Sequence, residues 1–406
     1  MNDSSPDPGI RLPAVQTQWS DQWSLDPGTV YLNHGSFGPS PMPVRESTSQ
    51  WSRRLESQPM DFFLRQLEPA LDDAYIRLGK SLGASPDRLV FVDNATFAMN
   101  IVATGIPLEP NDEILLTDHE YGAVHRIWTA RCQAAGARVT TVSLPWPFES
   151  SEEVAQSVLS AVTSRTRLIV ISHVTSPTAL TLPVAEICRE ARRRGIATCI
   201  DGPHAIAILP LSLDRLDADF YCASCHKWLC AAFGSGFLYV APRQRANISP
   251  PVRSWGRSLG GRSRHWRDEY TWSGTRDPAA WLSIPTAIEF LEEIGLDQFR
   301  KHGRELVRYA GQQLADRGLA QPIVDLESDW FTTMLACEID APQIPMPQKN
   351  DTDLIQSRLW EDYRIEIPCT RHLGKRLLRI SCHLYNSREQ IDYLCSCLEH
   401  VLRTND

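Results

Sequence analysis

The sequence predicts an α/β protein with a mainly parallel sheet of seven strands, helices on both faces of that sheet, and a smaller C-terminal α+β domain. Between residues 89 and 240, short apolar runs alternate with segments of helical periodicity, as in chains whose parallel strands are joined by crossover helices. Residues 250–276 interrupt this alternation with arginines and tryptophans. After Pro285 a long helical run opens a remainder in which helical signals outnumber strand signals.

The length and composition agree with two domains of unequal size. The chain has 406 residues, of which 42% are hydrophobic and 22% charged, as is usual for a globular protein. We expect an N-terminal arm over residues 1–30, a large domain over 31–284 whose N-terminal segment adds to the small domain, and a small domain over 285–406.

The elements follow in order along the chain. The first thirty residues are rich in Pro, Ser, Asp and Gln and have no periodicity, which indicates an arm. Residues 43–83 carry apolar side chains at steps of three or four, which predicts helix with interruptions at Pro59 and Pro69. Further helices are expected over 184–194 and 287–296. The seven strands are expected over 89–92, 113–116, 138–142, 168–172, 197–200, 220–223 and 236–240.

Composition also excludes several classes of function. The longest aliphatic run, Leu168–Ile171, is far shorter than the roughly 18 apolar residues of a spanning helix, and residues 1–13 lack the basic start and apolar core of a secretory signal. We therefore expect a cytoplasmic protein with no membrane segment, whose 11 cysteines are reduced. A net charge of -8 argues against nucleic acid or anionic membrane as partners and favours small-molecule chemistry.

Two motifs suggest chemistry that the rest of the chain does not support. Cys222, Cys225 and His226 match the C-x-x-C-H pattern of haem attachment and of redox pairs, but without an export signal we interpret the thiols as packing residues. His119 and His125 are six residues apart, whereas a zinc-protease helix needs two histidines four apart. No metal site is predicted, and the common nucleotide-binding glycine loops are absent from the sequence.

A lysine and a carboxylate indicate a different cofactor. Lys227 follows one apolar strand and precedes another, so it lies in a loop at the sheet, where a lysine of lowered pKa can act as a nucleophile. Asp201 follows the strand over 197–200, at the edge where α/β sheets bind ligands, and a carboxylate there can keep a pyridine nitrogen protonated. A surface lysine and a turn-capping aspartate are the alternatives. Together the two residues suggest pyridoxal 5'-phosphate.

Several separated motifs resemble the class V aminotransferase family of fold type I pyridoxal-phosphate enzymes, and within it the isopenicillin N epimerase-like group and its carbon-sulfur lyase relatives. The resemblance spans roughly Tyr31 to Leu394. It rests on Asp201-Gly-Pro-His204, Ser224-Cys-His226-Lys227, Tyr31-Leu-Asn-His-Gly-Ser-Phe-Gly38, Thr117-Asp-His-Glu-Tyr121, His173-Val-Thr-Ser-Pro-Thr178 and Trp272-Ser-Gly-Thr275.

The resemblance implies roles at the cofactor ring. Lys227 would hold the cofactor covalently and move the α-proton of the substrate as general base and acid. Asp201 would protonate the pyridine nitrogen. His204 and Ser176 match positions that reach the ring hydroxyl, with Ser176 standing where many relatives have Asn. Tyr121 matches the aromatic residue stacked on the ring, for which packing alone is the alternative.

The phosphate group needs hydrogen-bond donors. Ala95 and Thr96 follow a strand and open a helix, so their backbone N–H groups can point at an anion. Ser224 and His226 would add side-chain donors from the lysine loop. Gly274 and Thr275 correspond to a segment that in the family crosses from the neighbouring subunit, which implies a homodimer with shared active sites.

The substrate is expected to be an amino acid. Arg379 resembles the arginine that clamps the substrate α-carboxylate in the family, and a surface ion pair is its alternative interpretation. Asn33 and His34 would lie close to the same carboxylate. The arginines between Arg253 and Arg276 would bind a second substrate carboxylate or belong to a solvated interface loop.

Fold and cofactor do not decide the reaction. Epimerisation needs a second proton donor opposite Lys227, for which Tyr121, His34 and an ordered water are candidates. Elimination by a carbon-sulfur lyase and transamination are alternatives. Cysteine desulfuration would need a reactive thiol, and Cys369 lies ten residues before Arg379, closer than in desulfurases. A cofactor-free binding module is the non-enzymatic alternative.

Overall fold

The computed structural model describes residues 11–13, 17–348 and 351–404, and the chain divides into two compact units. The small unit consists of Met1–Pro39, Thr175–Thr181 and Gly295–Asp406. The large unit consists of Ser40–Val174 and Leu182–Ile294. The large unit therefore ends at Ile294, after the helix that begins near the expected boundary at residue 285. Parts of the predicted arm, residues 1–10 and 14–16, lie outside the described residues.

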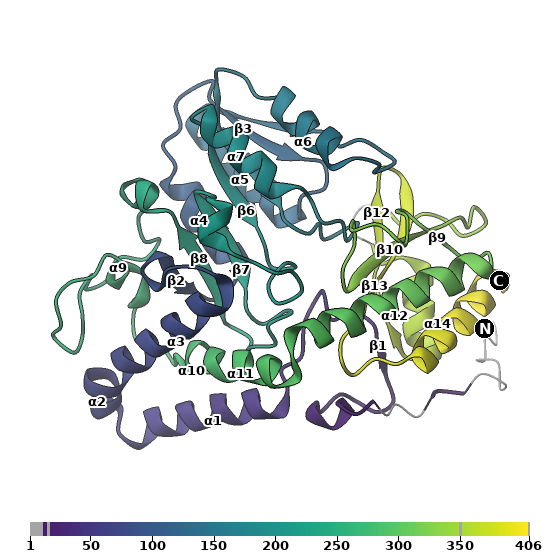
Figure 1. Cartoon of the computed structure of the whole chain (residues 1–406), viewed down its shortest axis with the longest axis horizontal. Coiled ribbons are helices and arrows are strands. Elements are labelled where there is room, and N and C mark those ends of the chain that lie inside the picture. The colour runs from purple at the N-terminus through teal and green to yellow at the C-terminus, as the bar shows by residue number, and fades with distance from the viewer. Residues whose placement is uncertain (1–10, 14–16, 349–350, 405–406) are drawn as a thin grey trace. The chain divides into compact units, whose positions relative to one another are not determined.

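The large unit is built on a seven-stranded sheet, as the sequence predicts (Figure 1). Six strands run parallel to one another, and β8 runs antiparallel to its neighbours β2 and β7. The spatial order is β2-β8-β7-β6-β5-β3-β4. The strands span Leu89–Val92 (β2), Glu113–Thr117 (β3), Arg138–Val142 (β4), Thr166–Ser172 (β5), Ala197–Asp201 (β6), Phe220–Ser224 (β7) and Gly236–Val240 (β8).

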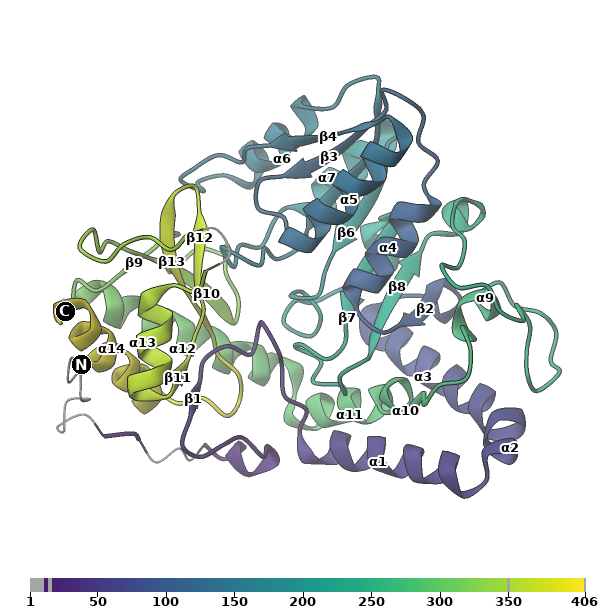
Figure 2. The same ribbon diagram turned by 180° about the vertical axis from the view of Figure 1, so that it is seen from behind.

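Helices cover both faces of this sheet. The helices α4 (Ala95–Gly105) and α5 (Gly122–Ala135) lie in front of the strands in Figure 2. Their side chains, among them Met99 and Trp128, share one core with alternate strand residues such as Leu168 and Cys199. The helices α6 (Ser151–Ser160) and α7 (Val184–Arg193) pack on each other, and α7 also packs on β5 and β6.

Further helices extend the large unit away from the parallel strands. Pro59 follows the break in the predicted helical region at Gln58, whereas Pro69 does not interrupt the helix, which continues through it from a π-helical turn into α3. A π-helical turn, Phe62–Gln66, joins α2 to α3. The bounds are Met42–Ser57 (α1), Pro59–Asp61 (α2), Leu67–Leu82 (α3), Leu213–Leu216 (α8), Asp268–Thr271 (α9), Ala279–Leu282 (α10) and Ile284–Ile294 (α11).

The small unit contains more strand than the sequence suggests. Its antiparallel sheet has the order β12-β13-β10-β9, and α12 and α14 pack on each other. A separate pair, β1 and β11, runs parallel. The strands are Val30–Tyr31 (β1), Gln321–Pro322 (β9), Met334–Ile339 (β10), Ile365–Glu366 (β11), Cys369–His372 (β12) and Lys375–Ser381 (β13). The helices are Leu296–Asp316 (α12), Leu354–Tyr363 (α13) and Arg388–Arg403 (α14).

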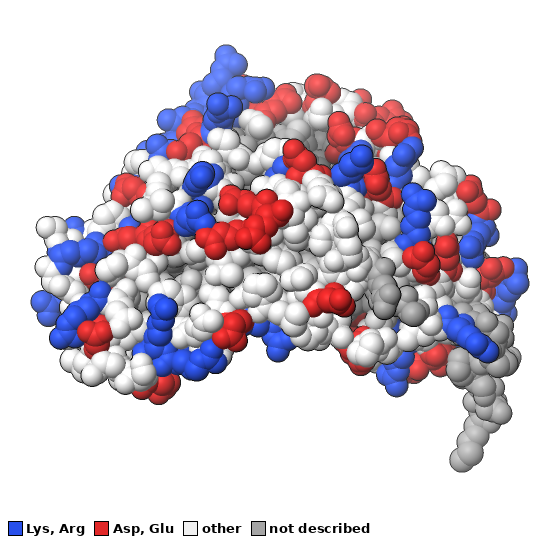
Figure 3. Space-filling view, turned by 60° about the horizontal axis from the view of Figure 1, so that its bottom comes forward, with Lys and Arg blue, Asp and Glu red and all other residues white. Residues whose placement is uncertain are grey.

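The surface carries both charges. On the face shown in Figure 3, acidic and basic side chains are interspersed. Among the described residues, none of the helices is both long and apolar enough to cross a membrane.

Candidate active site

The carboxyl ends of the central strands bring the predicted catalytic residues to one edge of the sheet. Asp201 is the last residue of β6, and Ser224 is the last residue of β7. Register pairs Asp201 with Ser172 on one side and with Cys222 on the other. Because parallel strands end at the same edge, Asp201 and the loop that carries Lys227 lie on the ligand-binding side of the sheet.

Lys227 lies against His204, the histidine that the sequence predicts at the cofactor ring. The Nζ of Lys227 is 3.1 Å from Nε2 of His204, and the side chain of Lys227 is only partly exposed. Asp201 is 7% exposed, and burial raises the pKa of its carboxyl to about 6 although the charge of Lys227 opposes this shift. Neither the surface-lysine nor the turn-capping alternative describes these two side chains.

A second layer of residues holds Asp201 in place. The backbone carbonyl of Asp201 accepts from the N–H of His173 at 2.9 Å, and the N–H of Gly202 donates to Cys222 at 2.8 Å. Residue 202 must be glycine, since a Cβ there would lie 2.0 Å from the ring of Tyr221. The hydroxyl of Tyr221 is 2.9 Å from Nδ1 of His173, whose pKa is lowered to about 4 by burial, so this histidine is neutral.

The start of α4, where the sequence predicts a phosphate site, lies beside Ser224. The N–H of Ala95 donates to Oγ of Ser224 at 2.9 Å, and the N–H of Phe97 donates to the capping side chain of Asn94. The N–H of Thr96 has no acceptor among the described residues, so of the two predicted backbone donors it is the one left for a phosphate. Gly236 permits this arrangement, because a Cβ there would lie 2.9 Å from Cα of Asn94.

His226 adds a buried and unused nitrogen to this site. Its Nδ1 is buried and has no hydrogen-bond partner in the described part of the chain. Burial lowers the pKa of His226 and the nearby charge of Lys227 lowers it further, while a hydrogen bond with the backbone of Ser235 opposes both. An orphaned donor or acceptor of this kind is costly unless a ligand meets it. The donor set therefore fits the phosphate group that the sequence predicts.

Tyr121 and its neighbour Glu120 begin the next loop of the sheet edge. Tyr121 is 52% exposed, so core packing does not account for it. Glu120 is buried; its oxygens accept from the hydroxyls of Thr117 at 2.7 Å and Ser172 at 2.6 Å. Burial is the main cause that raises the pKa of Glu120 to about 7, and the charge of Asp201 adds to it. Sequence reasoning missed Glu120, although it stands within the motif that contains Tyr121.

In the small unit, Arg379 is held by neutral acceptors and is only 3% exposed. Its Nη1 donates to the carbonyl and hydroxyl oxygens of Ser176 at 2.6 and 3.2 Å. Its Nη2 donates to Oδ1 of Asn33 at 3.2 Å and to Oγ of Ser36 at 2.6 Å. Arg379 is thus not an exposed ion pair. Ser36 was missed, and the side chain of Ser176, predicted at the cofactor ring, contacts this guanidinium.

His34 does not join the group around Arg379. Its ring is fully buried, stacks on His383 with centroids 4.0 Å apart, and lies 2.8 Å from the hydroxyl of Tyr385 through Nδ1. Asn33 and Ser36 flank it in sequence but turn toward Arg379. A side chain buried among aromatic rings is a poorer proton donor to a substrate than the half-exposed Tyr121.

The segment that contains Gly274 and Thr275 runs close to α4 of the same chain. Thr275 is exposed, and Gly274 has a φ of 123°. The next residue, Arg276, pairs with Asp93 at 2.5 Å, directly before Asn94, which caps α4. This segment is thus at least partly exposed on the large unit.

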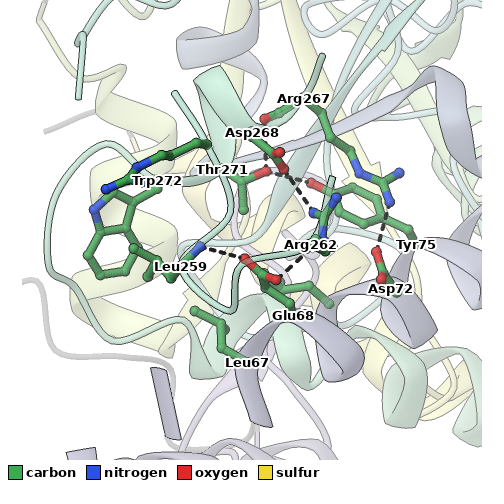
Figure 4. Close-up of a pocket in the computed structure, with 12 residues that line it drawn as sticks. Leu67, Glu68, Asp72, Tyr75, Leu259, Arg262, Arg267, Asp268, Thr271 and Trp272 are labelled. Atoms are coloured by element: carbon green, nitrogen blue, oxygen red, sulfur yellow. Dashed lines mark hydrogen bonds and ion pairs between the residues drawn. The ribbon is translucent and has the colours of Figure 1, made fainter. Parts of the chain in front are cut away.

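The arginines that precede this segment pair mostly within the chain. Figure 4 shows Arg262 beside Glu68 and Asp268, and Arg267 beside Asp72. Glu68 also accepts from backbone N–H groups of the same loop, including that of Leu259 at 2.8 Å. Arg264 pairs with Glu269. The contacts of Arg262 and Arg267 attach the loop to α3, and all three arginines are paired with carboxylates of the same chain, which argues against a second substrate-carboxylate site at Arg262, Arg264 and Arg267.

The cysteines are buried or nearly so. Cys222 and Cys225 are fully buried, and burial raises the pKa of both thiols, in agreement with packing residues. Cys369 is partly exposed in β12, and burial is the main cause that raises the pKa of its thiol. A thiol of raised pKa is a weak nucleophile near neutral pH.

The sequence profile of the aminotransferase class-V family matches residues 39–341. The chain belongs to the class-V aminotransferase family. The isopenicillin N epimerase of Amycolatopsis lactamdurans is 37% identical over 404 residues, which cover 95% of this chain and 99% of that protein. A probable chloroplastic L-cysteine desulfhydrase of Arabidopsis thaliana is 28% identical over 93% of this chain and 84% of that protein.

Solved structures agree with the class-V aminotransferase fold. A mutant of the lyase C-DES, with glycine covalently linked to its pyridoxal-phosphate cofactor, superposes with a TM-score of 0.77 at 21% identity. The alignment covers 91% of this chain and 96% of that one. The predicted family, fold class and enzymatic nature are confirmed, and pyridoxal phosphate is the cofactor of this family. The roles of individual residues stay predictions.

Proposed function

We propose that the chain is a pyridoxal-phosphate enzyme that inverts the α-carbon of an amino-acid substrate, as an isopenicillin N epimerase-like enzyme. The observation that carries the proposal is the 37% identity to an epimerase over almost the whole of both chains. The cysteine desulfhydrase named above has lower identity over a smaller share of its own length. The site geometry supports chemistry at an α-carbon. The choice between epimerisation, elimination and transamination is the subject of the experiments below.

The described residues fit the cofactor. Thr96, Ser224 and His226 would bind the phosphate, since the hydroxyl of Ser224 accepts from Ala95 and retains its own proton to donate. Asp201 would face the pyridine nitrogen, and Tyr121 would stack on the ring. His204 would donate from Nε2 to the ring hydroxyl. When bound, the cofactor supplies the electron sink that makes the α-proton acidic.

Two groups would then move protons at the α-carbon. Lys227 is the base on one side, because its amine sits at the predicted cofactor site within 3.1 Å of His204. Epimerisation needs a donor on the opposite face, and Tyr121 is the better candidate because it is half exposed whereas His34 is buried. An ordered water stays the alternative donor.

The α-carboxylate would bind to Arg379. Its guanidinium offers a planar pair of donors of the kind that suits a carboxylate. Asn33, Ser36 and Ser176 accept all four N–H groups of Nη1 and Nη2, so a bound carboxylate would have to displace some of these acceptors. We propose further that the enzyme is a cytoplasmic homodimer, in which Gly274 and Thr275 contribute to the phosphate site of the neighbouring subunit.

The deciding experiment incubates the enzyme with candidate amino acids, isopenicillin N among them, in deuterated water. The proposal requires deuterium at the α-carbon together with loss of chirality, measured by NMR and chiral chromatography. The Lys227→Ala variant is the control and should give neither. Transfer of the amino group to a keto acid, without inversion for any candidate, would contradict the proposal.

A carbon-sulfur lyase is the second candidate, because a desulfhydrase relative covers 93% of the chain. In the same incubation, cysteine would give pyruvate, ammonia and sulfide, and cystine would give pyruvate, ammonia and cysteine persulfide, in both cases without inversion. Cysteine desulfuration is less well supported, since the thiol of Cys369 is in a strand and its pKa is raised.

A cofactor-free binding module is tested separately. The purified enzyme should absorb visible light through its lysine-bound cofactor, and borohydride should abolish the band. Lys227→Ala should lack the band, whereas replacing Lys301, an exposed lysine of α12 in the small unit, should leave it unchanged. A colourless protein that does not take up added pyridoxal phosphate would contradict the enzymatic proposal.

A further inference from the structure

A buried tryptophan follows the predicted catalytic lysine and contacts the same histidine. Trp228 is fully buried, and its Nε1–H donates to Nδ1 of His204 at 3.4 Å. On the other side of the imidazole, Nε2 of His204 is 3.1 Å from Nζ of Lys227. His204 itself is 3% exposed, so its two ring nitrogens meet protein groups rather than bulk water.

This geometry determines which nitrogen of His204 carries the proton. A neutral imidazole has one donor and one acceptor nitrogen, and the hydrogen bond made by one nitrogen fixes the role of the other. Because the indole N–H can only donate, Nδ1 must accept, and the proton stands on Nε2. A doubly protonated imidazole would turn an N–H toward the indole N–H, which is unfavourable in a buried site.

The consequence reaches Lys227. With a proton on Nε2, His204 presents a donor to Nζ, and this tautomer therefore favours the neutral amine of Lys227 over the charged form that lowers the pKa values of Asp201 and His226. An ammonium would oppose this donor, although the nearby Asp201 attracts a positive charge. A neutral amine is the form that attacks a carbonyl carbon. The same Nε2–H is also the donor that the hydroxyl oxygen of a bound pyridoxal ring needs.

We propose that Trp228 is a positioning residue that sets the tautomer of His204 and, through it, keeps Lys227 ready to bind pyridoxal phosphate. Only the part about binding pyridoxal phosphate rests on the proposed function. The tautomer of His204 is a property of the chain without the cofactor. The loop between β7 and β8 thus supplies both the lysine and the tryptophan that prepares it.

The experiment compares the full-length chain with Trp228→Phe, which keeps a buried ring but removes the N–H. Trp128→Phe is the matched control: Trp128 is also fully buried, and its N–H donates to the sulfur of Met99 at 3.3 Å within the core. Cofactor is removed from all three proteins. Histidine side chains labelled with ¹⁵N report the tautomer at pH 7.5 through long-range proton–nitrogen correlations, and His204→Asn assigns the signal.

We expect His204 to be protonated on Nε2 in the parent chain and in Trp128→Phe, and to become a mixture of tautomers in Trp228→Phe. We also expect Trp228→Phe to capture added pyridoxal phosphate roughly five- to tenfold more slowly, the factor that the loss of one hydrogen bond typically produces. The capture rate of Trp128→Phe should match that of the parent chain.

Each outcome bears on the proposal. A parent His204 protonated on Nδ1, or on both nitrogens, overturns it even if Trp228→Phe fails to fold. An unchanged tautomer and capture rate in a folded Trp228→Phe overturns it too. If the parent chain shows the Nε2 tautomer but takes up no pyridoxal phosphate, the tautomer assignment stands and the proposed function fails.

Discussion

Replacing Glu120 with Gln tests the electrostatics beneath the predicted cofactor site. Glu120 is buried beside Thr117, Ser172 and Asp201, and its pKa is raised from 4.5 to about 7, chiefly by burial. The folded chain therefore holds a proton that the unfolded chain releases at lower pH. The charged form costs folding free energy, and that cost grows as the pH rises from about 4.5 and is complete above about 7.

The magnitude follows from the shift. One pKa unit corresponds to about 1.4 kcal/mol, so a shift from 4.5 to about 7 costs roughly 3.4 kcal/mol when complete. At pH 5.5 about 1.4 kcal/mol of this cost is present, and at pH 8.5 nearly all of it. Gln keeps both contacts if one hydroxyl rotates to accept, and it has no charge. The stability of Glu120→Gln relative to the parent should therefore rise by about 2 kcal/mol between these two pH values.

The assay is urea unfolding of the full-length chain at pH 5.5 and 8.5, with the cofactor removed. Glu113→Gln is the control: Glu113 is also buried on β3, but its hydrogen bonds from Thr140, Thr163 and Arg138 outweigh burial and lower its pKa to about 2. The charged carboxylate of Glu113 contributes its full stabilising free energy above pH 4.5, and this contribution is lost only as the pH falls through about 2. Glu113→Gln should therefore reduce the free energy of unfolding by the same amount at pH 5.5 and 8.5. An equal effect of Glu120→Gln at the two pH values would refute the reasoning.

Three further substitutions test the predicted site. Arg379→Lys loses the planar pair of donors, so kcat/KM should fall about 10- to 100-fold, mainly through KM; an unchanged KM would remove Arg379 from carboxylate binding. Ser224→Ala removes a phosphate donor and the acceptor of the Ala95 N–H, so the Kd for pyridoxal phosphate, followed by fluorescence, should rise about five- to tenfold. Unaltered affinity would exclude Ser224 from the site. Cys369→Ala should leave activity intact, and loss of sulfur release from cysteine would instead establish a desulfurase.

Most elements of the large unit could be predicted from local sequence patterns. The strand segments are short apolar runs bounded by turns, so periodicity alone located β2 to β8 to within about two residues. Asp201 and Lys227 could be predicted because a strand end followed by a loop is itself a local feature. The sheet of the small unit was predicted less well, since β10 and β13 are separated in sequence by α13, β11 and β12, and their pairing is not local.

The partners of the site residues could not be predicted in this way. The N–H of Ala95 is taken by Ser224, which is 129 positions away, and Arg379 is held by Ser36, which is 343 positions away. No periodicity or motif spacing encodes such contacts. The orientation of His34 into an aromatic cluster also depends on His383 and Tyr385 at the far end of the chain.

By itself, the sequence determined the fold class, the family and the residue types that a pyridoxal-phosphate site requires, because these depend on local periodicity and on motifs contiguous in the chain. Only the tertiary structure decided which atoms meet: the buried Glu120 near Asp201, and the indole N–H of Trp228 on His204. Proton positions and pKa shifts arise from burial and from donors brought together by folding, so they are properties of the assembled site and not of any segment.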